Sequence, residues 1–174
     1  SEFPARFQLV AAMNPCPCGW AGDPSGRCRC SPEHIRRYRA RISGPLMDRI
    51  DLHIEVPRLP PQDLRPDAPN GEATFLIRAR VEQARTVQLQ RAGKANAQLG
   101  QAETMAFCRL QDRDQALLER AIERLQLSAR SMHRILRVAR TIADLAGAED
   151  IATPHLTEAL GYRRMDRGQG QQAA

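Results

Sequence analysis

Residues 128–147 read SARSMHRILRVARTIADLAG, and this stretch decides the class of fold. Its apolar residues recur every three or four positions, as they do along one face of an amphipathic α-helix. They are Met132, Ile135, Leu136, Ala139, Ile142, Ala143 and Ala146. Ser128 is a favourable N-cap residue, and a glycine such as Gly147 commonly follows the last turn of a helix. The stretch therefore predicts a helix that buries one apolar face in a core.

Helical patterns continue on both sides of this stretch. Residues 72–91 contain good helix formers and neither proline nor glycine. A short helix is expected over residues 101–109, another from Asp112, and a last one from Thr153, which precedes a proline. We therefore expect an all-helical bundle over residues 72–162 and a protein that is mostly α.

The first third of the chain carries two strand patterns. Residues 7–13 are short and mainly apolar and end at Asn14-Pro15, which predicts a buried strand. Residues 50–56 alternate apolar and polar side chains, which predicts a strand with one buried face. A proline-rich stretch follows and cannot hold regular structure. Four parts are expected: a first part with two short strands and a cysteine-rich loop, a stiff linker, the bundle and a disordered polar tail. Their bounds are residues 1–57, 58–71, 72–162 and 163–174.

Four of the five cysteines lie within a Gly- and Pro-rich loop that has no helical or strand period. They are Cys16, Cys18, Cys28 and Cys30, in the pattern C-x-C-x9-C-x-C. No secretion signal is visible, so we expect a cytoplasmic protein and a metal site rather than disulfides. Four thiolates suit a structural Zn²⁺ ion in tetrahedral geometry. Ordinary buried cysteines or a redox pair remain the alternatives. A short basic helix should follow from Pro32.

Arginines form the second candidate site. Arg49 directly precedes the predicted strand at residues 50–56, where its planar guanidinium could meet a phosphate. An ion pair with a neighbouring aspartate is the alternative, and the residues by themselves favour it. Arg130, Arg134 and Arg137 share one face of the helix that begins near Ser128, opposite the apolar stripe. A solvated basic face is the alternative there.

The sequence excludes a P-loop nucleotide site and a membrane-spanning segment. The chain contains no G-x4-G-K-[ST] motif and so cannot cradle ATP phosphates in the manner of a P-loop. No apolar run approaches the length of about 18 residues that a membrane span requires, and no membrane partner is expected. The net charge of +6 makes an acidic partner plausible, with nucleotide phosphates and DNA as the obvious candidates.

Several runs together resemble one family. They are residues 11–19 (AAMNPCPCG), 28–32 (CRCSP), 37–39 (RYR), 43–53 (SGPLMDRIDLH), 128–130 (SAR) and 137–145 (RVARTIADL). In these runs the chain resembles the C-terminal part of the ComM/YifB family, which belongs with magnesium chelatase subunits and MCM helicases among the AAA+ ATPases. The fold implied is a remnant of the AAA+ α/β core followed by a helical lid.

The resemblance also implies roles for single residues. Asn14 matches the sensor 1 residue that orients the attacking water, and Arg49 matches the arginine finger that reaches a neighbouring subunit's ATP. Arg130 matches the sensor 2 arginine, with Arg134 and Arg137 in support.

The function implied is that of an ATP-driven DNA motor, a ComM-like branch-migration helicase that works as a ring homo-oligomer, expected to be a hexamer. ATP and Mg²⁺ would be bound mainly by an N-terminal part that this sequence lacks, together with its Walker A and Walker B motifs. The 174 residues by themselves should therefore be inactive. The alternatives are a zinc-stabilised module that binds DNA or protein, and a magnesium chelatase subunit.

Overall fold

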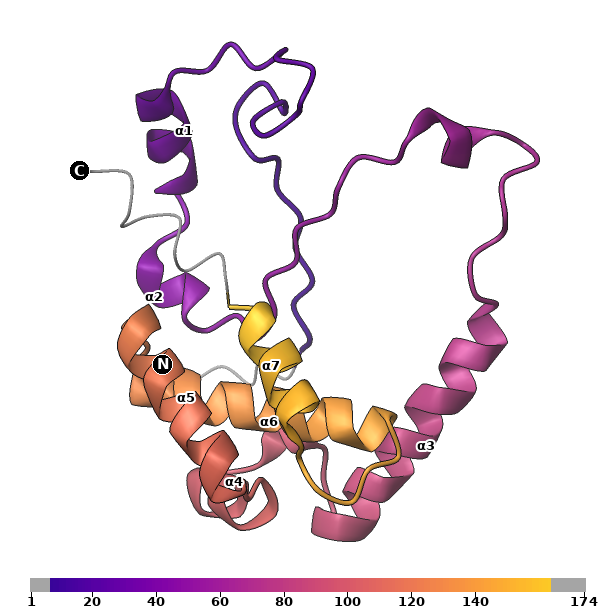
Figure 1. Ribbon diagram of the computed structural model, residues 1–174, viewed down its shortest axis with the longest axis vertical. Helices are drawn as coiled ribbons and strands as arrows, with labels where there is room; N and C mark the ends of the chain where they lie inside the picture. The colour runs from indigo at the N-terminus through magenta and orange to yellow at the C-terminus, as the bar shows by residue number, and fades with distance from the viewer. Residues whose placement is uncertain (1–6, 164–174) are drawn as a thin grey trace. The chain divides into compact units, whose positions relative to one another are not determined.

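The computed structural model describes residues 7–163, and all the regular secondary structure in this range is helical, with long irregular stretches before α1 and between α2 and α3 (Figure 1). The α-helices are α1 (Pro32–Arg39), α2 (Gly44–Met47), α3 (Thr74–Ala92), α4 (Gln101–Phe107), α5 (Asp112–Leu125), α6 (Ala129–Leu145) and α7 (Thr153–Gly161), and two short 3-10 helices are η1 (Pro61–Leu64) and η2 (Asn96–Gln98). The prediction of a mostly α protein is confirmed. Within residues 7–163 no helix combines the length and the apolar character that a membrane crossing requires.

The chain divides into two compact units between Met47 and Asp48. The first unit holds the cysteine-rich loop, α1 and α2. Its α1 begins as expected, because the Oγ of Ser31 caps it by accepting a hydrogen bond of 3.2 Å from the backbone N–H of His34. Cys16 is the one buried residue among residues 7–47. An ordinary hydrophobic core is therefore missing from this part of the described chain, and something other than apolar packing must order its loop.

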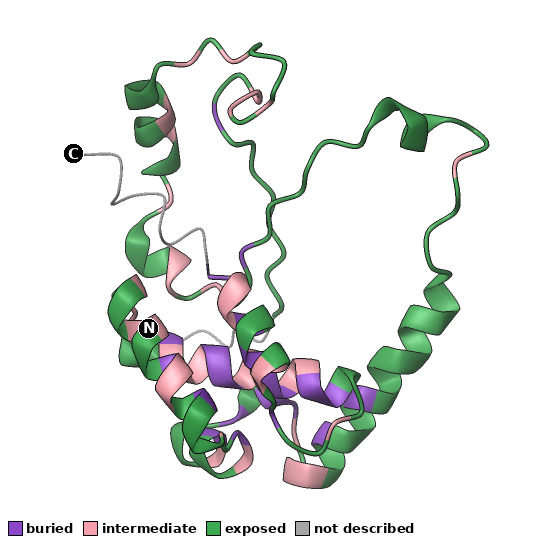
Figure 2. Cartoon of the chain, viewed as in Figure 1, coloured by how far each residue is buried: buried purple, intermediate pink, exposed green. Residues whose placement is uncertain are grey.

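The second unit is a helical bundle that packs around α6. Figure 2 shows the buried residues concentrated along this helix. The predicted apolar stripe lies in the core, with Ile135, Leu136, Ala139 and Ala143 at most 3% exposed. Leu118 of α5 and Leu156 of α7 complete the centre of the core. Helix α6 begins where Ser128 caps it, since the Ser128 Oγ accepts from the backbone N–H of Ser131 at 3.2 Å.

A buried carboxylate joins three elements of this bundle. The side chain of Asp144, on α6, is fully buried and pairs with Arg91 of α3 and Arg140 of α6. It also accepts a hydrogen bond of 2.8 Å from the Asn96 side chain in η2. A buried carboxylate is tolerated only when paired and hydrogen-bonded. Asp144 therefore fixes α3 and η2 on α6 where the apolar core ends.

The two predicted strands are not formed, and residues 7–163 contain no strand at all. Residues 7–13 are exposed and follow no regular structure. Along residues 50–56 the burial does not follow the alternation. Leu52, Ile54 and Val56 are exposed, whereas His53 is 8% exposed and donates its backbone N–H to the Tyr162 carbonyl at 3.0 Å. An alternating pattern gives a strand only where a neighbouring strand accepts its hydrogen bonds, and the described residues provide none.

The last residue of the described part also behaves unexpectedly. The predicted disordered tail lies outside the described residues except for its first member, Arg163. That side chain is 1% exposed. Its guanidinium donates to the backbone carbonyl of Ile50 at 2.8 Å.

Candidate functional site

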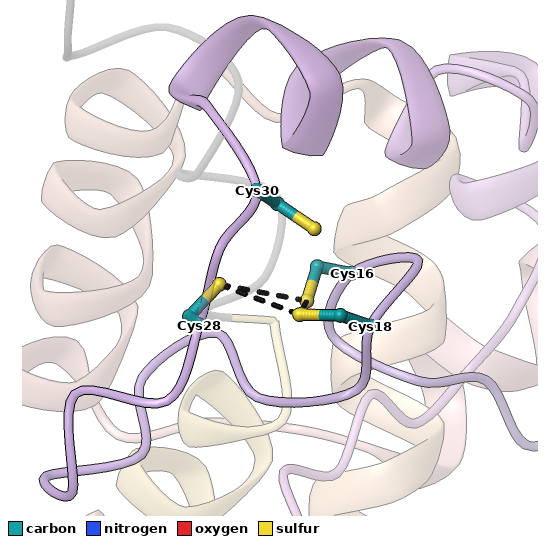
Figure 3. A group of neighbouring side chains, drawn as sticks. All are labelled: Cys16, Cys18, Cys28 and Cys30. Carbon is teal, nitrogen blue, oxygen red and sulfur yellow. Dashed lines mark hydrogen bonds between the residues drawn. The ribbon is translucent and has the colours of Figure 1, made fainter.

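Four sulfur atoms converge in the first unit. The Sγ atoms of Cys16, Cys18, Cys28 and Cys30 all lie within 4.8 Å of one another. Figure 3 shows the first pair and the second pair approaching from two limbs of the loop. The Sγ–Sγ distances are 3.4 Å between Cys16 and Cys18, 3.8 Å between Cys16 and Cys28, and 3.7 Å between Cys18 and Cys28. Tetrahedral Zn²⁺ with bonds of about 2.3 Å places its sulfurs about 3.8 Å apart. The donors and their spacing fit zinc.

The backbone of the loop is shaped for this arrangement. Gly19, with a φ of 80°, turns the chain directly after the first cysteine pair, in a conformation that favours glycine. The N–H of Gly19 then bonds the Cys16 carbonyl at 3.0 Å, and the N–H of Ala21 points at the Cys16 sulfur at 3.3 Å. Backbone N–H groups aimed at a sulfur stabilise its thiolate, which is the form that binds metal.

The thiols of the cluster have widely different pKa values. A hydrogen bond from the Arg29 backbone, a second from the Trp20 backbone and the Cys16 side chain lower the pKa of Cys18 to about 6. A hydrogen bond from the Cys18 backbone lowers the pKa of Cys30, but the Cys18 side chain, burial and the Cys16 thiolate outweigh it and raise that pKa to about 11. Closely spaced thiolates repel one another, and a dication would relieve that repulsion.

The second candidate site surrounds the N-terminus of α6. Arg130, Arg134 and Arg137 line one hollow there, with a volume of about 430 Å³. Leu99, Gln101, Thr104, Ala129 and His133 complete its lining. Three arginines on one wall give the hollow a positive charge, which attracts anions. The structure thus brings together the three arginines that the sequence places on one helical face.

These three arginines differ in what they already contact. Arg134 donates to the Arg49 carbonyl at 2.6 Å and pairs with the Asp51 carboxylate at 2.5 Å. Arg137 donates to two backbone carbonyls of the η2 region, at 3.2 and 3.0 Å. Arg130 is exposed and makes no hydrogen bond or ion pair with any part of the chain that the structure describes. Arg130 is therefore the arginine of the three best able to bind an external anion.

Arg49 lies on a segment that is docked against the same helix end. Its side chain is exposed. The preceding residue, Asp48, accepts from the hydroxyls of Ser131 and Ser128, with the Ser128 bond at 3.2 Å. These hydrogen bonds lower the pKa of Asp48, opposed by partial burial and assisted by the charges of Arg163 and Arg130. A carboxylate at a helix N-terminus also offsets the unfavourable position of Arg130 in the first turn.

Asn14 belongs to the other unit. It is exposed and stands where the cysteine loop begins, with its side-chain amide 3.9 Å from the position that a Cβ on Gly19 would occupy. Sequence reasoning missed Asp48, Ser131 and Arg163 as parts of the arginine site. Ser131 lies only three residues after the N-cap Ser128, and this was the one local feature of the sequence that could have pointed to a part of the site.

Comparisons with known proteins agree with this picture. Residues 71–163 match the family model described as magnesium chelatase, subunit ChlI C-terminal, and residues 1–64 match that of magnesium chelatase, subunit ChlI. The chain is 52% identical over 167 residues to the competence protein ComM of Haemophilus influenzae, covering 95% of this chain and 32% of that protein. It is 45% identical over 166 residues to the uncharacterized protein YifB of Escherichia coli, with coverage of 95% and 32%.

The chain therefore belongs to the magnesium chelatase ChlI family, in its ComM/YifB branch. It spans about a third of the length of the curated relatives it matches.

Proposed function

We propose that this chain is the C-terminal part of a ring-forming, ATP-driven DNA motor of the AAA+ class. In this role it supplies Asn14 as sensor 1, Arg49 as the arginine finger and Arg130 as sensor 2. The observation that carries the proposal is the arginine-lined hollow at the start of α6, with the Arg49 segment docked beside it. The sequence thus supplies arginines that could contact a triphosphate, but it contains no P-loop that could hold the triphosphate.

The exposed apolar segments support a missing partner. Phe7 and Val10 are 76% and 85% exposed, and Val56 is 86% exposed. We propose that residues 1–57 complete a sheet whose other strands lie in the remaining two thirds that the relatives possess. Residues 58–71 then act as a linker, and residues 72–162 as the lid. ATP and Mg²⁺ would be bound mainly by the two thirds of the relatives' length that this chain does not cover.

The chemistry expected of the three residues follows from phosphoryl transfer. Negative charge spreads over the γ-phosphate oxygens in the transition state, and an arginine finger stabilises it by a factor of about 10³–10⁵ in rate. Arg49, supplied to a neighbouring subunit's site, would make hydrolysis depend on ring assembly, expected to be hexameric. The Asn14 amide would orient the attacking water. Arg130 would bind the phosphates from the lid.

The test is ATP hydrolysis by the full-length protein. Arg49→Ala should lower kcat by about 10³-fold or more while changing KM little, because a finger acts mainly in the transition state. Arg78→Ala removes an exposed arginine of α3 and serves as the control. Normal turnover by the Arg49→Ala protein would defeat the proposal. The 174-residue chain should show no turnover unless subunits with an intact P-loop are added.

A second candidate function, a zinc-stabilised DNA-binding module, is favoured by the charge of the first unit. Residues 27–41 contain six arginines and one glutamate. Arg36, Arg37 and Arg39 occupy the last turn of α1. Arg27 lies over the Trp20 ring at 4.0 Å. Such a basic surface next to an aromatic ring suits a nucleic-acid backbone.

Anisotropy of a labelled DNA oligonucleotide separates the two functions. If the module binds DNA, replacing Arg36 and Arg37 by alanine should weaken binding by the chain and flatten its salt dependence. The matched control replaces Arg78 and Arg85, two exposed arginines of α3. Unchanged binding would remove this candidate. The DNA-binding module would be the better proposal if Arg49→Ala left hydrolysis normal while serine substitutions of the four cysteines abolished DNA binding. These cysteines are Cys16, Cys18, Cys28 and Cys30.

A further inference from the structure

The segment that carries Arg49 is attached to α6 on the side of its first turn. Asp48 accepts hydrogen bonds from Ser131, whose side chain is fully buried, and from Ser128, the N-cap residue. Both serines flank Arg130 in the sequence. The carboxylate that precedes Arg49 is thus fixed to the turn that presents Arg130.

Arg134 holds the same segment from the next turn of α6. Its Nη1 donates to the carbonyl of Arg49 itself at 2.6 Å and reaches the Asp51 carboxylate. The Arg134 side chain is 18% exposed. An arginine held in this way binds backbone and carboxylate at once, and its charge strengthens both hydrogen bonds. Its geometry serves the Arg49 backbone rather than an external ligand.

Arg163 completes the attachment from the residues after α7. Its guanidinium donates to the Ile50 carbonyl at 2.8 Å and, in longer contacts of 3.4 Å, to the Asp48 carbonyl and the Ser131 hydroxyl. The side chain is almost completely buried. Burying a guanidinium is costly unless hydrogen bonds compensate for the lost water, and here backbone carbonyls accept them. Here those bonds define the backbone on both sides of Arg49.

We infer that Asp48, Ser131, Arg134 and Arg163 form a clamp whose task is to position Arg49 relative to the first turn of α6. The inference rests on the proposed function of Arg49 as the finger. None of the four needs to touch nucleotide for this task. They are positioning residues that act through the Arg49 backbone. A displacement of about 1 Å at a reacting group lowers rates by about 10²-fold, so such a clamp matters for turnover.

The clamp also links two events. Arg130 stands in the same turn of α6 as Ser131. When a nucleotide draws Arg130 and the start of α6 towards its phosphates, the clamp carries the Arg49 backbone along. The regulation inferred is that occupancy sensed by Arg130 sets the position of the finger.

A double-mutant cycle in the full-length protein tests the clamp. Ser131→Ala removes one hydroxyl from the clamp and leaves the apolar core in place. It should lower kcat by about 10-fold to 100-fold with little change in KM. In a protein that already carries Arg49→Ala, the same substitution should change kcat by less than about twofold, because the clamp acts only through Arg49. Thr157→Ala, which removes an exposed hydroxyl from α7, is the matched control.

The outcomes separate the two ideas. Equal losses from Ser131→Ala with and without Arg49 would overturn the clamp and leave the finger intact. Normal hydrolysis by Arg49→Ala alone would overturn both.

Hydrogen exchange in the 174-residue chain gives a readout that does not depend on hydrolysis. Asp48→Ala and Ser131→Ala should speed exchange of the His53 amide, which donates to the Tyr162 carbonyl, by at least about 10-fold, since the clamp holds this segment on the bundle. Amides of α6 and α7 in the core should keep their protection. Asp48→Asn, which retains an oxygen for the serine hydroxyls, should restore part of the protection. Unchanged exchange of the His53 amide would overturn the clamp.

Discussion

Asp48 shows how one side chain can serve both the start of α6 and the backbone next to Arg49. Its carboxylate accepts from Ser131 and Ser128 and lies close to the charges of Arg163 and Arg130. Each of these partners favours the ionised form, so the folded chain binds a proton at Asp48 less readily than the unfolded chain does. The carboxylate therefore contributes stability only while it is ionised.

This sign gives a pH dependence. The pKa of Asp48 is lowered in the folded state, so its contribution is complete above the unfolded value of about 4 and declines as pH falls through the lower folded value. At pH 7 Asp48→Asn should lower the free energy of unfolding by about 1 kcal/mol. Urea titrations of both chains from pH 7 to pH 3 measure the difference. A gap that widens in acid would contradict the prediction.

At the scale of elements, local signals were sufficient for the helices and insufficient for the site. Ser128, the apolar stripe of α6 and Gly147 lie within one stretch, so its helix could be predicted with its ends. The bond between Asp48 and Ser131 joins residues 83 positions apart, and no spacing rule reaches that far. Alternation over residues 50–56 predicts a strand without showing that a neighbouring strand is present, and residues 7–163 supply none.

Asp144 supports a prediction about how elements hold together. It pairs with Arg91 and Arg140 and bonds Asn96, so it links α3 and η2 to α6. Asp144→Ala would leave two guanidinium groups, one of them 3% exposed, without their carboxylate. The expected loss is about 3–5 kcal/mol in the free energy of unfolding. Denaturant unfolding followed by circular dichroism measures it.

The control for Asp144 is Glu82, whose ion pair with Arg78 on α3 is exposed. Glu82→Ala should cost less than about 1 kcal/mol. Equal losses at the two positions would mean that burial does not set the strength of the Asp144 contacts.

At the scale of the whole molecule, the two units depend on different physics. The second has an apolar core of its own, whereas among residues 7–47 Cys16 is the only buried residue. If zinc orders the first unit, its binding free energy supplies the folding free energy that packing does not. Removing the metal should then unfold one unit and leave the other intact.

The chain contains one tryptophan, Trp20, and it lies in the cysteine loop. Protein prepared without chelators should contain about one equivalent of zinc. Adding a strong chelator should shift the Trp20 emission to the red as the ring meets water, while most of the helical circular dichroism from α3 to α7 persists. Cys28→Ser should reproduce this state, and Cys108→Ser should not, because Cys108 lies in the core of the other unit. The prediction fails if the protein contains less than about a tenth of an equivalent of zinc. It also fails if the chelator changes the Trp20 emission and the helical circular dichroism together, because the two units would then not unfold separately.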